Sequence, residues 1–270
     1  MKAVFGWMTV AVLMMLTISA DARQPAVGID PKALIEQIVS VAKRQREQIK
    51  DVVFETEFFS GENDNNTSQV ESRFVKKVYL KFFDDTTWFH QEYLEYYKNG
   101  KLQSPEKRDK KAAEIIKKNH KRQAGDISRS VLLPFYPELK KNYDITYDGV
   151  TEDKIDGYIC HKFTVHSKVE EQSYINGDFF FEAETFHLVR VDFTPTKLTQ
   201  SLSYSLRTLD ISIRYDSSPD GFWFPRQIDI KGKGKTSFLF GVEFATTEYL
   251  RNPKINTNLS NELFEVDYDK

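Results

Sequence analysis

The residues that could do chemistry are few and lie far apart along the chain. The five histidines are His90, His120, His161, His166 and His187. Because successive strand residues point to opposite faces, His161 and His166 of one expected strand cannot share a metal ion. His90 and Glu92 do share a face, but a pair at that spacing is common by chance. We therefore predict no metal site.

The single cysteine is a candidate nucleophile, because Cys160 is followed by His161, a possible base. Adjacent side chains of an extended segment diverge, so Cys160 is instead predicted to be a buried structural thiol. The nucleophile-elbow, zinc-protease, phosphate-loop and C-x-x-C motifs are all missing from the sequence. The sequence thus predicts no catalytic residue, no cofactor and no enzyme. An envelope hydrolase whose carboxylates converge only in the folded chain is the third-ranked alternative.

The composition excludes two further classes of protein. Lys and Arg number 38 against 40 Asp and Glu, and the resulting formal charge of -2 lacks the basic excess of a nucleic-acid binder. Hydrophobic residues make up 40% of the chain and aromatic residues 14%, which is enough for a sizeable core and excludes a disordered tail. The 21 Phe and 13 Tyr residues favour β structure.

The first thirty residues predict export. Lys2 is followed by an apolar run from Ala3 to Ile18 and by an A-x-A cleavage site that ends at Ala22. We predict a signal peptide over 1–22 and one mature domain over 23–270. An uncleaved anchor is the alternative, although the run is shorter than the roughly 20 apolar residues of a membrane span. No cysteine lies near the site, so lipid cannot be attached there.

A long amphipathic helix is expected next. Asp30-Pro31 combines a capping side chain with a proline at the first helical position. Apolar residues then recur at helical spacing on one side, namely Leu34, Ile35, Ile38, Val41, Ala42 and Ile49. We therefore predict a helix that lies on an apolar surface.

Beyond Val52 the period of the pattern changes to two, which predicts strands. Phe74, Val78, Leu80 and Phe82 share one parity, with Lys76 as the exception. Ten strands are predicted, at 52–60, 69–83, 86–98, 143–151, 156–167, 172–182, 186–194, 204–216, 222–232 and 235–250. Short turns join them, so we expect an antiparallel meander with one packed and one solvated face.

A basic helical insertion interrupts the meander. It starts at Ser104-Pro105, and residues 106–122 hold eight Lys or Arg against three Asp or Glu. We expect it to cross one mouth of the curved sheet, followed by an apolar patch at 131–137. A solvated helix face is the favoured interpretation, and the alternative is a surface that contacts an anionic membrane or an acidic partner protein. Its predicted partner-binding residues are Lys117, Lys118, Lys121 and Arg122.

The apolar face of the sheet has two possible states. Either the helices fill the hollow and form a core, or an apolar cavity remains. A cavity of this kind suits acyl chains, because burying each CH₂ group contributes about 0.8 kcal/mol. The residues predicted to bind lipid are Val78, Leu80, Phe82, Phe238, Phe240 and Phe244 in strands, and Leu132 and Phe135 in the lid.

Three local motifs stand out along the chain. Residues 156–163 match a "dG-y-y-l" strand opening, 179–190 a "y-f-D-x-e-t-x-l-x-R" hairpin with Glu182 where Asp is usual, and 220–225 a "dG-x-W-x-P" turn. In these motifs and in the order of its elements the chain resembles the LolA-like family of periplasmic lipoprotein carriers. The resemblance covers residues 30–250. It implies a mainly β fold with a few helices, a half-open antiparallel β-barrel of about eleven strands closed by a helical lid, without cofactor or catalysis.

These observations together predict a periplasmic, monomeric and non-enzymatic carrier. Its partners would be lipid or the acyl chains of lipoproteins, held in an apolar hollow of the curved sheet. The alternative is an envelope sensor or interaction module on the same fold, which docks a partner protein through the basic helix at 104–122.

Overall fold

The computed structural model describes residues 30–64, 67–83, 87–119, 131–171, 174–198, 204–236 and 240–264. The helices are α1 (Pro31–Gln48), α2 (Pro105–Asn119) and α4 (Pro137–Lys140), with short 3-10 helices η1 (Leu133–Phe135) and η2 (Asn261–Phe264). The strands are β1 (Asp51–Asp64), β2 (Thr67–Phe82), β3 (Thr87–Lys98), β4 (Lys101–Leu102), β5 (Tyr143–Val150), β6 (Cys160–Ser167), β7 (Ile175–Glu182), β8 (Leu188–Pro195), β9 (Tyr204–Ser217), β10 (Trp223–Thr236) and β11 (Phe240–Ile255). The predicted signal peptide lies outside the described residues.

Helix α1 begins where the sequence predicts. The Asp30 carboxylate accepts a hydrogen bond from the Lys32 backbone N–H at 2.9 Å, and Pro31 takes the first helical position. The buried side of the helix carries Leu34, Ile35, Ile38 and Val41. The helix ends because Ile49 has extended backbone angles, and the chain enters β1 two residues later.

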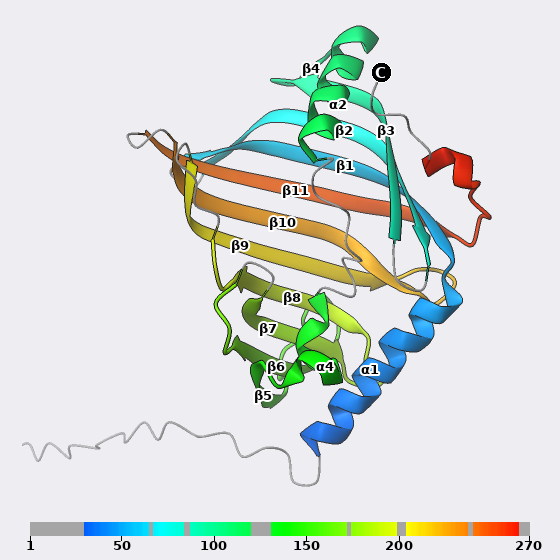
Figure 1. Ribbon diagram of the computed structural model, residues 1–270, viewed down its shortest axis with the longest axis vertical. Coiled ribbons are helices and arrows are strands. Elements are labelled where there is room, and N and C mark those ends of the chain that lie inside the picture. Colours follow the sequence, from blue (N-terminus) through cyan, green and yellow to red (C-terminus); the bar gives the residue numbers. More distant parts are fainter. Residues whose placement is uncertain are drawn as a thin grey trace, which may run out of the picture.

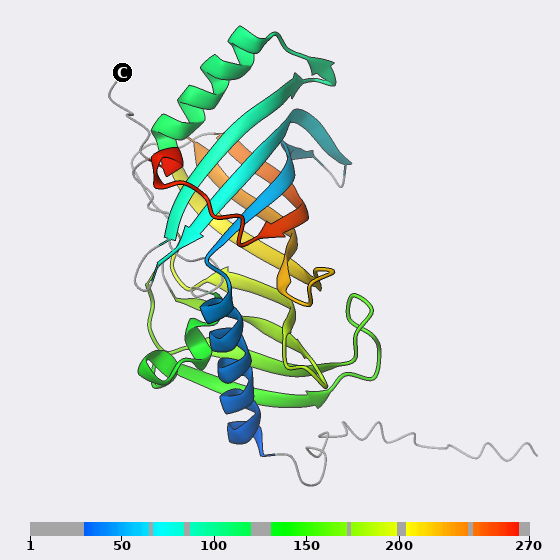
Figure 2. The ribbon, with the colours of Figure 1, turned by 90° about the vertical axis from the view of Figure 1, so that its right-hand side faces the viewer.

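All described strands belong to one antiparallel sheet in the order β4-β3-β2-β1-β11-β10-β9-β8-β7-β6-β5. The meander prediction is confirmed, apart from the pairing of β1 with β11, which are the first and the last of the described strands. Figure 1 shows β1, β11, β10 and β9 side by side across the middle of the molecule. Figure 2 shows the strong curvature of this sheet.

The sheet is not closed, so of the predicted half-open barrel the open, mainly β antiparallel sheet with few helices is confirmed. Its two edge strands, β4 and β5, lie at opposite ends of the strand order. Strand β4 has two residues, and the Arg108 guanidinium of α2 donates a hydrogen bond to the Leu94 carbonyl of β3 at 2.9 Å. A helix rather than a strand therefore covers part of this edge, which is one way to protect unpaired strand groups. The predicted helical lid stays a prediction.

The strand count is eleven rather than ten, and one predicted boundary moves. The missed strand β4 follows a tight turn at Asn99 and Gly100, whose φ angles of 49° and 75° are both positive. The predicted strand 156–167 begins only at Cys160, because Asp156 (φ 49°) and Gly157 (φ 101°) form a turn between Ile155 and Tyr158.

The sheet has a short-strand half and a long-strand half. In the short-strand half, β5 to β8 have 8 residues each. In the long-strand half, β1, β2, β9, β10 and β11 have 14 to 16 residues and β3 has 12. Each half has its own cluster of buried residues, the larger one under the short strands.

Candidate functional site

The long strands have an apolar face, here called the inner face. It carries Phe54, Thr56 and Phe58 of β1, and the pairing register places side chains of neighbouring strands beside them. These neighbours are Phe74, Lys76 and Val78 of β2, Glu248 and Leu250 of β11, Ile228 and Ile230 of β10, and Ile211 and Ile213 of β9. The opposite, outer face is charged, with ion pairs such as Arg73–Glu57 and Lys233–Glu243.

Two of the predicted lipid-binding residues lie in the filled core of the short-strand half. Phe135 of η1 is 1% exposed, and its ring makes edge-to-face contacts with three phenylalanines of β6 and β7. These are Phe163 at 5.7 Å, Phe179 at 5.1 Å and Phe181 at 5.3 Å. Leu132 belongs to the same cluster, as do three residues of α1. In this half the hollow is occupied by the protein's own side chains.

Three further predicted residues pack where α1 enters β1. Val78 is buried with Ile49, Val52, Phe54 and Phe224, and Leu80 and Phe82 pack against this small cluster. The Arg46 guanidinium lies 4.5 Å from the centre of the Phe82 ring. Lipid binding by these residues stays a prediction.

The inner face is only half-buried farther along the long strands. Phe58, Ile230 and Phe244 are all partly exposed and belong to neither buried cluster. The Phe244 ring lies directly over Gly232 of β10, so closely that a Cβ there would collide with it. Of the other predicted residues, Phe240 opens β11 without a described side chain, and Phe238 lies outside the described residues.

A charged pair interrupts the half-buried apolar face. Lys76 Nζ lies 2.9 Å from Glu248 Oε1, and the two side chains are only 12% and 22% exposed. The same ammonium lies 5.5 Å from the centre of the Phe58 ring. Burial, and next the charge of Glu248, raise the pKa of Tyr93 to about 12. Lys76, Glu248, Tyr93 and Thr56 are called the inner polar cluster below.

Thr56 gives this cluster an unpaired group. The residue is 2% exposed, and its hydroxyl has no hydrogen-bond partner in the part of the chain that the structure describes. It lies opposite Lys76 on β2 and opposite Leu250 on β11. A buried hydroxyl without a partner is costly, which makes this position a candidate for contact with a ligand.

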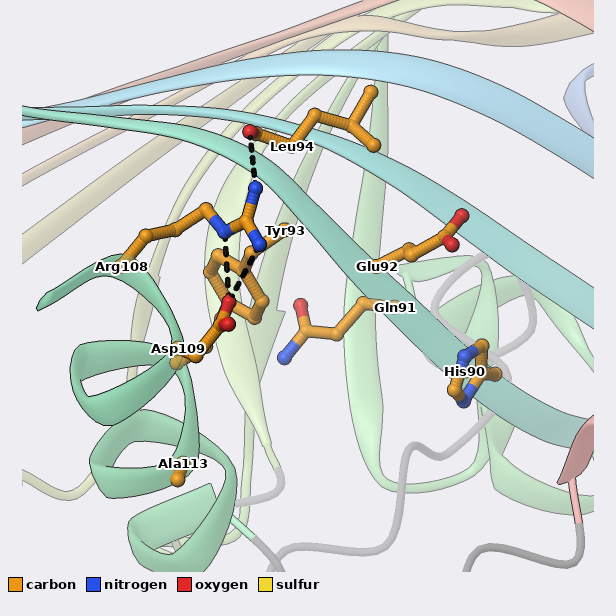
Figure 3. A pocket seen from close by; sticks show the side chains of 9 residues that line it. His90, Gln91, Glu92, Tyr93, Leu94, Arg108, Asp109 and Ala113 are labelled. Atoms are coloured by element: carbon orange, nitrogen blue, oxygen red, sulfur yellow. Dashed lines mark hydrogen bonds and ion pairs between the residues drawn. The ribbon is translucent and has the colours of Figure 1, made fainter. Parts of the chain in front are cut away.

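An open pocket of about 460 Å³ lies between α2 and β3. Figure 3 shows its wall on α2, where the Arg108 guanidinium pairs with the Asp109 carboxylate and bonds the Leu94 carbonyl. Its lining residues are His90, Gln91, Glu92, Tyr93, Leu94, Arg108, Asp109, Ala112 and Ala113. Tyr93 therefore belongs both to this pocket and to the inner polar cluster.

The residues considered for chemistry take structural positions. Burial raises the pKa of the Cys160 thiol to about 12, and the residue is 0% exposed in the larger cluster. The Tyr147 hydroxyl and His161 Nδ1 lie 2.9 Å apart, and burial lowers the pKa of His161. Within the described ranges, no three His, Cys, Asp or Glu side chains are grouped as a metal site requires. None of the helices in those ranges is long and apolar enough to span a membrane.

The predicted partner-binding residues lie at the end of α2 and beyond it. Lys117 and Lys118 belong to the last turn of the helix, and their side chains are not among those described. Lys121 and Arg122 lie outside the described residues. Partner binding by these four residues stays a prediction.

Sequence reasoning missed the inner polar cluster, although one signal for it was present. Lys76 breaks the apolar parity of its strand, and Glu248 breaks the parity of Phe244 and Val242 in the same way. These two opposite charges can be recognised as an ion pair only when β2 and β11 are known to be the two neighbours of β1. That neighbourhood depends on the β1–β11 pairing, which joins distant parts of the chain.

No protein-family model and no curated protein sequence matches the chain. One similar solved structure is an outer membrane lipoprotein-sorting protein domain from Vibrio parahaemolyticus, with 10% identity and a TM-score of 0.44 over 86% of this chain and 97% of that one. A DUF1329 family protein from Desulfovibrio piger has 17% identity and a TM-score of 0.44 over 88% and 98%. A LolA superfamily protein from Nitrosomonas europaea has 10% identity and a TM-score of 0.37 over 86% and 98%. The third of these structures bears the name of the family that the motifs of this chain resemble.

Proposed function

We propose that the chain is an exported, non-catalytic carrier or binder of lipid or of acylated protein. In this proposal a cleaved signal peptide at 1–22 directs it to the periplasm. The acyl chains lie on the inner face of the long strands, with the helices as a lid. The function requires no reaction step, only the exchange of apolar contacts between the lid and the ligand.

The half-buried apolar side chains of the inner face carry this proposal. Phe58 of β1, Ile230 of β10 and Phe244 of β11 lie on this one face, where the register pairs them with Glu248, Thr246 and Gly232, and all three are outside both buried clusters. Apolar side chains that remain partly in water on the packed side of a sheet are an unused source of binding energy. Each CH₂ group of a ligand buried there would contribute about 0.8 kcal/mol.

Native mass spectrometry of the mature protein from an envelope fraction, followed by organic extraction, tests this function. We expect a co-purifying mass of several hundred daltons that extracts as lipid and corresponds to about one acylated molecule per protein. An apo mass that is unchanged after incubation with envelope lipids and an acylated peptide would contradict the proposal.

A matched pair of variants on β10 separates binding from folding. Ile230→Asp places a charge on the inner face, whereas Lys231→Asp places it on the solvated outer face one residue away. We expect Ile230→Asp to abolish lipid capture and Lys231→Asp to leave it intact. Circular dichroism should show that both variants are folded. Equal capture by the two variants would exclude the inner face as the binding surface.

A second candidate is docking of an acidic partner protein through α2. The observation that favours it is the exposure of Lys107 and Lys110 on this helix, whereas Arg108 and Lys111 pair with carboxylates of the same helix. Exchanging Lys117, Lys118, Lys121 and Arg122 for Gln should abolish salt-sensitive partner binding and leave lipid capture intact. Loss of lipid capture in this variant would count against a separate docking surface.

A further inference from the structure

We propose that the inner polar cluster is a subsite that binds a neutral hydrogen-bonding group of the ligand, the amide or ester linkage of an acyl chain. This inference rests on the proposed function, because it specifies the ligand of the same inner face. The four residues are Lys76 on β2, Glu248 on β11, Tyr93 on β3 and Thr56 on β1.

The cluster crosses the sheet at one level. Lys76 is paired with Thr56 and with Tyr93 in the strand register, and Glu248 is paired with Phe58. The ion pair between Lys76 and Glu248 therefore reaches diagonally across β1. A ligand chain lying on the inner face would meet Lys76, Glu248 and Tyr93 within one short stretch of its length, with the Thr56 hydroxyl beneath them.

Stability does not account for an ion pair at this place. Removing two charges from water costs more than a typical surface ion pair returns, and apolar replacements of buried pairs are often neutral or stabilising. Here the pair lies among aromatic rings, with the Lys76 ammonium 5.5 Å from the Phe58 ring centre. The position therefore points to a role in recognition.

The cluster has unused hydrogen-bonding capacity. An ammonium group has three donors and a carboxylate has about four acceptor positions, and in the described residues the pair satisfies one of each. The hydroxyl of Thr56 is buried without a partner. An amide offers a carbonyl to Lys76 and an N–H to Glu248, and an ester offers the carbonyl alone.

The charges in the cluster favour a neutral group over a carboxylate. The ion pair is neutral as a unit, so an ionised fatty acid would add a second negative charge beside Glu248. Tyr93 adds no third charge, because its pKa is raised to about 12 by burial and by Glu248, and the phenol stays a neutral donor. Free fatty acids should therefore bind less tightly than acyl amides or esters.

The pocket beside the cluster offers space for the rest of the ligand. Its volume of about 460 Å³ lies within the usual range for small-molecule sites, and Tyr93 and Gln91 line it from β3. Figure 3 shows α2 on the opposite side of this pocket. A linkage held at Lys76 would place one end of the ligand on the inner face and the other beside α2.

The test compares N-methyl lauramide, lauric acid and dodecane by competition with an environment-sensitive apolar dye. Measurements are made at a pH at which lauric acid is ionised. We expect the wild-type protein to bind the amide about tenfold more tightly than the acid, as a hydrogen bond to a charged group allows. The Lys76→Met/Glu248→Gln variant should lose this preference and still bind dodecane.

The chain offers a matched control for this variant. Lys233 Nζ and Glu243 Oε1 also lie 2.9 Å apart, on the outer face, with side chains that are 60% and 42% exposed. Lys233→Met/Glu243→Gln should keep the full preference for the amide. Tyr93→Phe removes one hydroxyl and keeps the ring, and it should reduce the preference for the amide severalfold. This variant replaces Lys76→Met/Glu248→Gln in the test if that double variant does not fold.

The outcomes separate this inference from the proposed function. Equal binding of amide and acid by the wild-type protein, with dodecane also bound, would overturn the polar subsite and leave the carrier function standing. Failure to bind any of the three ligands would overturn both. Loss of the preference in the outer-face control as well would show that the inner polar cluster is not its source.

Discussion

The two halves of the sheet use the same alternation of apolar and polar residues with different results. In the short-strand half, η1 and α1 place Phe135 and three apolar residues of the first helix onto the phenylalanines of β6 and β7. In the long-strand half, comparable side chains such as Phe58 and Phe244 stay partly exposed. An apolar sheet face therefore becomes a core only where another element is long enough and close enough to cover it.

Polar contacts also contribute to the stability of the long-strand half. Asp51 at the start of β1 is 2% exposed, and its carboxylate accepts hydrogen bonds from Thr257, Asn258 and Leu259 after β11. On the outer face Glu57 pairs with both Arg73 and Arg251. A half held together in this way can leave part of its apolar face free for a ligand.

The largest expected effect separates the two halves directly. Phe135→Ala removes a ring from the filled core and should lower the free energy of unfolding by about 3–5 kcal/mol. Phe244→Ala removes a half-buried ring and should cost less than about 2 kcal/mol, while weakening lipid binding. Urea denaturation and ligand titration of both variants measure this. Equal losses of stability would show that the long-strand half is as tightly packed as the other.

The next effect concerns the polar clamp at Asp51. Asp51→Ala would leave three backbone N–H groups and the Thr257 hydroxyl without their acceptor, so we expect a loss of roughly 3 kcal/mol. Hydrogen exchange should show the loss at the β1–β11 pairing rather than in β5 to β8. Asp153→Ala, at an exposed carboxylate, is the control. Uniform destabilisation of both halves would argue against two separately stabilised regions.

A smaller effect comes from the contact between Phe244 and Gly232. Gly232→Ala places a methyl group against the Phe244 ring, which must move away from the sheet. Overpacking of this kind costs about 1–3 kcal/mol, and the displaced ring would occupy space on the inner face. We expect weaker capture of long acyl chains, measured by dye displacement. Unchanged capture would place the acyl chains away from β10 and β11.

The sequence predicted the fold better than the site for a physical reason. Helix capping at Asp30 and the alternation in β2 are local signals, and both elements appear where those signals lie. The openness of the sheet depends on which strands end as neighbours, and the pairing of Lys76 with Glu248 depends on β1 lying between β2 and β11. Neither the open edge of the sheet nor this ion pair can be predicted from the spacing of nearby residues. The only local signal for the cluster was Lys76, which breaks the apolar alternation of its strand.

The smallest expected effect is a dependence of stability on pH that originates in the short-strand half. Burial lowers the pKa of His161 and of His187, so the unfolded chain binds protons more readily than the folded chain. Their contribution to stability is therefore complete above the unfolded pKa of about 6.5 and is lost as the pH falls through the lower folded values. Thermal melting should show a midpoint that falls on acidification from neutral pH.

Substitution of one histidine locates this dependence. His161→Gln should flatten the pH dependence of the melting midpoint, whereas His166→Gln, at an exposed position of the same strand, should not. Because His161 stacks on Phe186 and lies 2.9 Å from the Tyr147 hydroxyl, its protonation should loosen the short-strand half first. Protection from hydrogen exchange would then fall in β5 to β8 before it falls in β9 to β11. The reverse order would mean that the aromatic core is not the more strongly pH-dependent of the two halves.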